Sequence, residues 1–119
     1  MAKDLGFVML LDCYGEFLTE RQKQVTELYY AEDLSLGEIS ELSGITRQAV
    51  RDSIKRSEDI LLNMEEKLKF AERLSALREK FAEIDGAAEC MAENAENPAL
   101  LLEKCSAIRE NVQEGLHLL

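Results

Sequence analysis

The sequence predicts an all-α protein, with a compact helical bundle followed by a helical arm. One proline and six glycines in 119 residues leave few breaks for a turn-rich β architecture. Aromatic residues make up only 6% of the chain and tryptophan is absent, which is a weak composition for sheets. Apolar residues at 46% and charged residues at 32% exclude a disordered chain and allow a hydrophobic core.

The first forty residues carry the start and stop signals of short helices. Residues 5–14 have an apolar stripe at helical spacing, and Gly15 is placed to end that helix. Thr19 and Ser35 each begin a further helix, because each has a glutamine or glutamate three residues later, as in a capping box. The stripe of the first helix comprises Leu5, Val8, Met9 and Cys13, and the apolar face expected after Ser35 comprises Leu36, Ile39 and Leu42.

Residues 36–50 have the layout of a helix-turn-helix. The small side chain of Ser40 lies where the two helices would cross, and Gly44 supplies a turn conformation that a Cβ disfavours. Thr46 is placed to cap the second helix. The apolar positions that would hold the second helix across the first are Ile39, Ile45, Val50 and Ile54.

The chain is acidic, but a local surplus of basic residues falls on the second helix of this motif. The net charge is −10, which argues against bulk attraction to nucleic-acid phosphates or anionic membranes. A local basic patch can still bind, because salt confines the field of an exposed charge to roughly 10 Å. Residues 46–56 contain four basic residues and one acidic residue, so their local charge is +3.

Three of these basic side chains recur at every fourth position. Arg47, Arg51 and Lys55 therefore share one helical face, which we expect to lie opposite the buried residues of the same helix. Arginine can pair with guanine and glutamine with adenine, and the start of such a helix commonly reaches base edges. The alternative is an ordinary solvated helix face. The candidate nucleic-acid-binding residues are Thr46, Arg47, Gln48, Arg51, Lys55 and Arg56.

The hydrophobic register predicts a break in the long helix-forming stretch that follows. No glycine or proline occurs over residues 47–85, but the apolar positions before and after Leu68-Lys69-Phe70 are out of phase. Because the buried face must rotate there, we expect a bend at this point. The predicted organisation is a helix-turn-helix bundle over residues 1–70 and a helical arm over residues 71–119.

The arm is predicted to carry heptad-like apolar stripes. A short helix is expected over residues 87–95, and Asn97 followed by Pro98 is a favourable start for the last helix. One face of that helix comprises Leu101, Cys105, Ile108 and Val112. We expect this stripe to pack against the arm itself or a second copy, giving a homodimer; the alternative is a groove for another partner.

No residue pattern indicates an enzyme. The single histidine, His117, lies in an apolar stretch without a carboxylate partner at helical spacing, and there is no glycine-rich phosphate loop, nucleophile elbow or metal-ligand cluster. Cys13, Cys90 and Cys105 are odd in number and far apart, which favours thiols over a disulfide or metal site. The sequence has no signal peptide and no span of about 18 apolar residues. We therefore expect a non-enzymatic cytoplasmic protein with no cofactor, metal or membrane partner.

Several segments resemble region 4 of bacterial sigma factors, which reads the −35 promoter element. They are Leu18-Thr19, Gln22, Leu28-Tyr29-Tyr30, Leu34-Ser35-Leu36, Glu38-Ile39 and, after the turn, Val50-Arg51. The resemblance implies a bundle wound like that of sigma region 4. The chain lacks the other sigma regions, so it is not a complete sigma factor.

A closer resemblance is to the YlxM family, small bacterial cytoplasmic proteins whose genes typically neighbour those of the signal recognition particle GTPase. It rests on Leu11-Asp12-Cys13-Tyr14-Gly15 before Leu18-Thr19, together with Thr46-Arg47-Gln48-Ala49-Val50 and Ile54-Lys55-Arg56, and it covers about residues 5–70. It implies a role in the signal recognition particle pathway or in regulation.

Two functions are therefore expected as alternatives. In the first, the protein is a regulator that binds duplex DNA, and a dimer formed through the arm would hold two recognition helices about 34 Å apart in successive major grooves. In the second, implied by the family resemblance and the net charge of −10, it is an accessory protein that contacts the signal recognition particle GTPase or RNA and does not bind DNA. An acidic surface would then complement a basic partner and speed association.

Overall fold

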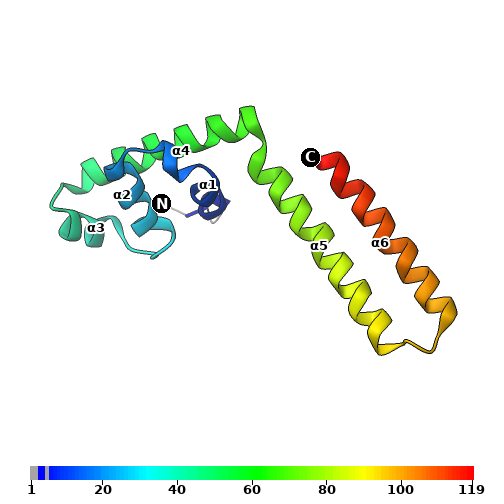
Figure 1. The fold of residues 1–119 in the computed structure, drawn as a ribbon. Helices are drawn as coiled ribbons and strands as arrows, with labels where there is room; N and C mark the ends of the chain where they lie inside the picture. Colours follow the sequence, from blue (N-terminus) through cyan, green and yellow to red (C-terminus); the bar gives the residue numbers. More distant parts are fainter. Residues whose placement is uncertain (1–2, 5) are drawn as a thin grey trace. The chain divides into compact units, whose positions relative to one another are not determined.

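The computed structural model describes residues 3–4 and 6–119, and every regular element within them is a helix, which confirms the predicted all-α class (Figure 1). The chain divides into two compact units, Met1–Ala71 and Glu72–Leu119. The elements in chain order are α1 (Gly6–Tyr14), the 3-10 helix η1 (Gly15–Phe17), α2 (Glu20–Tyr30), α3 (Leu36–Ser43), α4 (Arg47–Leu68), α5 (Phe70–Glu93) and α6 (Pro98–Leu118).

The core of the first unit lies where α4 packs against α1, α2 and α3. Ile39 from α3 and both Val50 and Ile54 from α4 have no exposed surface, as their place in the predicted motif requires. Full burial of such a side chain contributes about 1.5–3 kcal/mol relative to exposure. Leu42, expected on the apolar face of α3, is instead 68% exposed. The buried residue of this short helix is Ile39, and its last turn is open to solvent.

The buried face of α1 differs from the predicted stripe. The buried residues are Phe7, Leu11 and Tyr14. The predicted stripe is only partly buried at Val8, Met9 and Cys13, and Leu5 lies outside the described residues. Most side chains of α1 are apolar, so their spacing does not single out one face. Aromatic packing decides it, because the ring of Phe7 stacks on that of Tyr30 with centroids 5.2 Å apart.

A left-handed residue and two side chains form the joint between α4 and α5. Lys69 has φ 52°, which ends α4 and confirms the bend expected at this point. The Tyr14 hydroxyl donates to Glu65 Oε1 at 2.6 Å and accepts from the Phe70 N–H at 3.0 Å. The Ala71 N–H donates to the same Glu65 oxygen at 3.0 Å. These bonds satisfy N–H groups in the first turn of α5, which have no partner within the helix.

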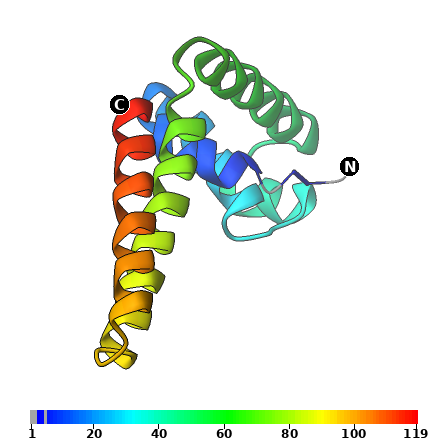
Figure 2. The same ribbon diagram turned by 90° about the vertical axis from the view of Figure 1, so that its right-hand side faces the viewer.

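The second unit is a hairpin in which α5 and α6 run side by side in opposite directions (Figures 1 and 2). α6 begins as predicted, since the Asn97 side chain accepts from the Leu100 N–H at 3.2 Å and Pro98 is the first helical residue. The separate helix expected over residues 87–95 is wrong, because α5 continues without a break through Gly86. The two alanines that follow Gly86 have high helix propensity, which offsets the roughly 1 kcal/mol that a glycine costs in a helix.

Candidate nucleic-acid interface

The turn between α3 and α4 has the geometry that a helix-turn-helix requires. Gly44 has φ 74° and ψ 15°, a left-handed conformation that residues with a Cβ disfavour. Its N–H donates to the Ser40 carbonyl at 3.0 Å, and the Ser40 hydroxyl donates to the Ile45 carbonyl at 2.5 Å. Ser40 therefore closes the turn as well as keeping the helices close. α1 ends at Tyr14, directly before Gly15, as expected, although Gly15 has no positive φ and begins η1.

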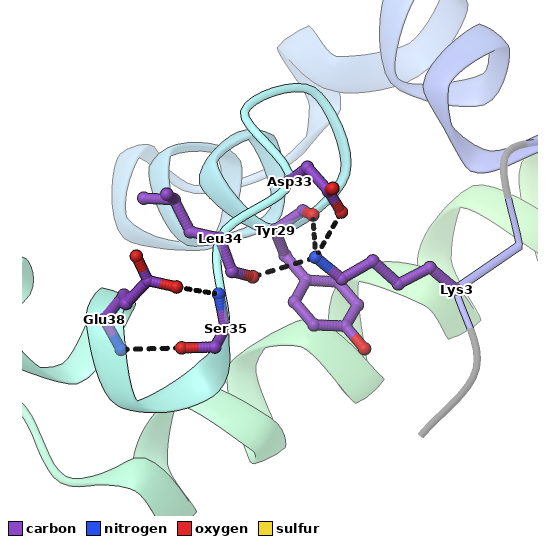
Figure 3. Close-up of polar contacts among 6 residues, drawn as sticks. All are labelled: Lys3, Tyr29, Asp33, Leu34, Ser35 and Glu38. Carbon is purple, nitrogen blue, oxygen red and sulfur yellow. Dashed lines mark hydrogen bonds and ion pairs between the residues drawn. The ribbon is translucent and has the colours of Figure 1, made fainter.

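The start of α3 is tied to the N-terminal segment through Lys3 (Figure 3). Lys3 Nζ donates at 2.9 Å to three oxygens, which are the carbonyls of Tyr29 and Leu34 and Oδ1 of Asp33. The ammonium also lies 4.2 Å from the centroid of the Tyr29 ring, over its face. Lys3 thus joins the last turn of α2 to the segment that leads into α3. No sequence signal identified it, because a single lysine has no spacing that marks a contact.

N-caps fix the first turns of both helices of the motif. The Ser35 hydroxyl accepts from the Glu38 N–H, and the Glu38 carboxylate accepts from the Ser35 N–H, both at 3.1 Å, as predicted (Figure 3). The hydrogen bonds from the backbone and side chain of Ser35 lower the pKa of Glu38, so its carboxylate is charged at neutral pH. The Thr46 hydroxyl accepts from the Ala49 N–H at 3.0 Å, which gives this candidate contact residue a capping role in the free protein.

Two of the six predicted contact residues are engaged by aspartates of their own helix. Gln48 Nε2 donates to Asp52 Oδ1 at 2.9 Å, and Lys55 Nζ lies 3.5 Å from Asp59 Oδ1. Both aspartates are exposed, and their spacing of seven residues places them on nearly the same line along α4. An acidic line therefore runs along the exposed face of α4 and separates its basic side chains into two groups.

Arg47 and Arg51 lie on the side of α4 next to the start of α3. Successive residues of an α-helix are rotated by 100° about its axis, so Arg47 lies only about 20° from the buried Ile54 in this projection. The expectation that Arg47 lies opposite the buried residues is therefore wrong. Its guanidinium crosses Gly37, where an added Cβ would lie 2.5 Å from Arg47 Nη2. The groove between the two helices is lined by Ser35, Leu36, Gly37, Arg47, Gln48 and Arg51.

Arg56 lies on the other side of α4, together with Arg21 from the first turn of α2. They share a groove of about 520 Å³ that is also lined by Thr19, Gln22, Ile45, Ala49, Asp52 and Ser53. The Ser53 hydroxyl is buried there and makes no hydrogen bond with any described residue. Sequence reasoning missed Arg21 because it precedes the motif. One feature of the sequence could have drawn attention to Arg21: it is a basic residue in the first turn of a capped helix, where acidic residues are favoured.

The arginines on the two sides of α4, together with the N-terminus of this helix, are suited to anion binding. The first turn of α4 has no acidic residue, whereas those of α2 and α3 contain Glu20 and Glu38. The positive end of the α4 dipole is therefore not offset by a carboxylate of its own first turn. An α-helix with its side chains is about 10–12 Å wide, which matches a DNA major groove of about 12 Å.

The described part of the chain has no helix long and apolar enough to span a membrane. Within the same ranges, no three histidine, cysteine, aspartate or glutamate side chains gather as metal ligands would. Cys13, Cys90 and Cys105 all lie in the described ranges, and no disulfide joins any two of them.

Comparison with known proteins supports the expected family. The model of the UPF0122 family, described as "Putative helix-turn-helix protein, YlxM / p13 like", matches residues 1–101. The chain is 52% identical over 82 residues to a UPF0122 protein of Desulforamulus reducens, covering 66% of this chain and 70% of that protein. It is 42% identical over 102 residues to one of Thermoanaerobacter sp. (strain X514), covering 85% and 87%. It is 45% identical over 85 residues to one of Caldanaerobacter subterraneus, covering 71% and 73%.

Proposed function

The chain belongs to the UPF0122 family, and from this membership and the geometry of α3 and α4 we propose that it is a regulator that binds duplex DNA. In this proposal α4 enters the major groove as the recognition helix. A fold alone does not define a function. The observation that carries the proposal is that two arginines lie on each side of α4: Arg47 and Arg51 on one side, and Arg56 with Arg21 of α2 on the other. The proposal needs no catalytic group, cofactor or metal. The resemblance to YlxM proteins suggests that the regulation concerns the signal recognition particle pathway.

The two pairs of arginines would contact phosphates on opposite strands. On one edge Arg47 lies against Gly37 in the first turn of α3. On the other edge Arg21 and Arg56 line one groove beside the start of α2. A helix in the major groove has one sugar-phosphate backbone on each side, so each pair meets one strand. Such contacts set the orientation of the protein on the duplex.

The exposed face of α4 that lies between the two pairs of arginines would face the base edges. Gln48 can pair with adenine, and Asp52 can accept from the amino group of cytosine. The Gln48–Asp52 hydrogen bond of the free protein would be exchanged for these contacts. Because phosphate repels Asp52, docking that places this face on the backbone is disfavoured. Thr46 and Lys55 would contribute backbone contacts at the two ends of this face.

Fluorescence anisotropy of labelled mixed-sequence duplex DNA tests the proposal. We expect affinity to fall roughly 10³-fold between 50 mM and 200 mM salt if about six phosphates are contacted. Replacing Arg47, Arg51 and Lys55 together by alanine should abolish binding without loss of helical content. A matched control replaces Arg73, Arg78 and Arg109, which are exposed in the second unit, and should bind like the wild type. Binding that is absent at 50 mM salt, or unchanged in the first variant, would refute the proposal.

Gly37→Ala provides a second variant that removes no charge. The added methyl group would occupy the space of the Arg47 guanidinium, 2.5 Å from Nη2, and would displace that side chain from the start of α3. Alanine is the better helix former, so folding should not suffer. We expect weaker DNA binding at unchanged net charge. Unaltered affinity would show that the position of Arg47 does not matter for binding.

A second candidate function is favoured by the acidic line on α4. Asp52 and Asp59 engage Gln48 and Lys55, and the whole chain carries −10, so a basic protein surface is an alternative partner. The family resemblance suggests the signal recognition particle, through its GTPase or its RNA. Size-exclusion chromatography with the reconstituted particle at low salt tests this candidate. Co-elution in the absence of DNA binding would favour it, and separate elution would remove its support.

A further inference from the structure

The two helices of the second unit carry an apolar seam of heptad type. Alternating steps of four and three residues connect a series on each helix, the pattern of coiled coils and four-helix bundles. On α5 the series is Leu74, Leu77, Phe81, Ile84, Ala88 and Met91. On α6 and its final residue it is Leu101, Cys105, Ile108, Val112, Gly115 and Leu119. In such assemblies both alternating positions of every helix point into a common core.

The seam residues of each helix fall into two alternating sets, and packing of α5 against α6 buries mainly one of these sets. Gly115 is buried, and an added Cβ there would lie 3.6 Å from Leu77 Cδ2, so these positions meet between the helices. Their equivalents Ile84, Met91, Leu101 and Ile108 are partly buried. The other position is open, because Phe81 is 65%, Val112 43% and Leu119 85% exposed. Ala88 and Cys105 in the same series are also exposed, while Leu74 is partly buried.

The open positions surround an apolar hollow of about 120 Å³ between the two helices. Its apolar lining comprises Leu77, Phe81, Ile84, Val112, Leu116 and Leu119. The polar side chains at its edge have partners within the hairpin, since Lys80 pairs with Glu114 and Asn111 Nδ2 donates to the Ala107 carbonyl at 3.0 Å. Nothing in the hollow therefore requires a polar ligand, and an apolar surface would complement it.

We propose that this face is covered by the same face of a second copy of the chain, forming a four-helix bundle from two hairpins. Each hairpin supplies two helices of similar length, 24 and 21 residues, with half of the seam open. A bundle that turns both positions inward needs two more such helices, and a second copy provides them through a two-fold axis.

The exposed apolar area is of the size that a stable dimer needs. The open parts of Phe81, Val112, Leu116 and Leu119 amount to roughly 450 Å² at ordinary side-chain areas. A standard interface buries about 800 Å² per partner, and homodimer interfaces are about 65% apolar, which corresponds to roughly 500 Å². The agreement favours an extended partner surface over a single inserted side chain.

Sedimentation equilibrium of the full chain from 1 to 100 µM tests the proposal without DNA. We expect the wild type to approach twice 13.5 kDa. Phe81→Glu with Val112→Glu should remain near 13.5 kDa at 100 µM. The matched control, Ala82→Glu with Gln113→Glu, adds the same charges at exposed neighbouring positions and should dimerise like the wild type.

Phe81→Ala keeps the test valid if the glutamate variant loses its helical content. This milder change should weaken dimerisation at least tenfold, because a large aromatic side chain at the centre of an interface is typically a hot spot. A wild-type mass near 13.5 kDa at every concentration would overturn the proposal and leave the face to another protein or to the chain itself. A dimer that survives Phe81→Ala unchanged, or that the control disrupts equally, would overturn the assignment of this face.

Discussion

Removal of the Tyr14 hydroxyl tests whether the joint between α4 and α5 stabilises the first unit. Tyr14 is 2% exposed, and its hydroxyl bonds both the Glu65 carboxylate and the Phe70 N–H. Tyr14→Phe keeps the aromatic ring but removes both hydrogen bonds. A hydrogen bond to a charged group contributes about 1.5–3 kcal/mol, and a buried N–H without a partner costs about 1–3 kcal/mol. Because Glu65 and Phe70 retain access to water, we expect a loss of about 2 kcal/mol in the free energy of unfolding.

Urea unfolding followed by tyrosine fluorescence measures this loss in the first unit alone, because all three tyrosines lie there and tryptophan is absent. With an m-value of about 2 kcal/mol/M, the midpoint should fall by about 1 M. Tyr30→Phe is the matched control, since it removes a hydroxyl that donates to Glu58 at 3.0 Å away from the joint. It removes one hydrogen bond where Tyr14→Phe removes two, so a smaller loss is expected. A Tyr14→Phe loss below 0.5 kcal/mol, or no larger than that of the control, would refute the reasoning.

Three further changes probe the turn, the N-terminal contact and the pH response. Gly44→Ala should cost about 1–2 kcal/mol in urea unfolding because φ is 74° there, whereas Gly86→Ala, in open space within α5, should stabilise by up to about 1 kcal/mol. Lys3→Met keeps the apolar stem but loses three hydrogen bonds, so a loss of about 1–2 kcal/mol is expected; a wild-type midpoint would contradict this role. Burial and the Glu65 hydrogen bond raise the pKa of Tyr14, so the unfolded chain loses this proton first and stability should fall as pH rises above 10. Equal urea midpoints at pH 9 and pH 11 would contradict the predicted fall in stability.

The features that the sequence predicted correctly are those encoded by a few neighbouring residues. The capping box at Ser35 and the left-handed turn at Gly44 each require particular residue types at fixed spacing, and the structure has both. The break at Lys69 was visible because the apolar positions on either side are out of phase, although the residue itself is neither glycine nor proline. Short-range chemistry of this kind does not depend on which other element packs nearby.

The features that sequence reasoning missed depend on contacts between distant segments. The buried face of α1 is decided by Phe7 and Tyr14, whose partners Tyr30 and Glu65 come from other helices. Spacing along one helix could not show that Arg47 lies against the start of α3 or that Arg21 on α2 shares a groove with Arg56. The six candidate residues, five on α4 and one at its N-cap, therefore gave an incomplete surface. Helical periodicity defines a face, and only tertiary packing defines what lies beside it.

The acidity of the chain is compatible with a basic interface, because most acidic residues are farther from a bound phosphate than the arginines are. Residues 46–56 carry +3 in a chain of −10, so the remaining residues sum to −13. At 0.15 M salt the Debye length is about 8 Å, so a phosphate beside Arg47 or Arg56 is influenced mainly by side chains of its own groove. At 0.01 M salt the length is about 30 Å, and the acidic surface then repels the same phosphate. At physiological salt the distant acidic residues are therefore largely screened from such a phosphate, whereas the arginines beside α4 lie within reach of it.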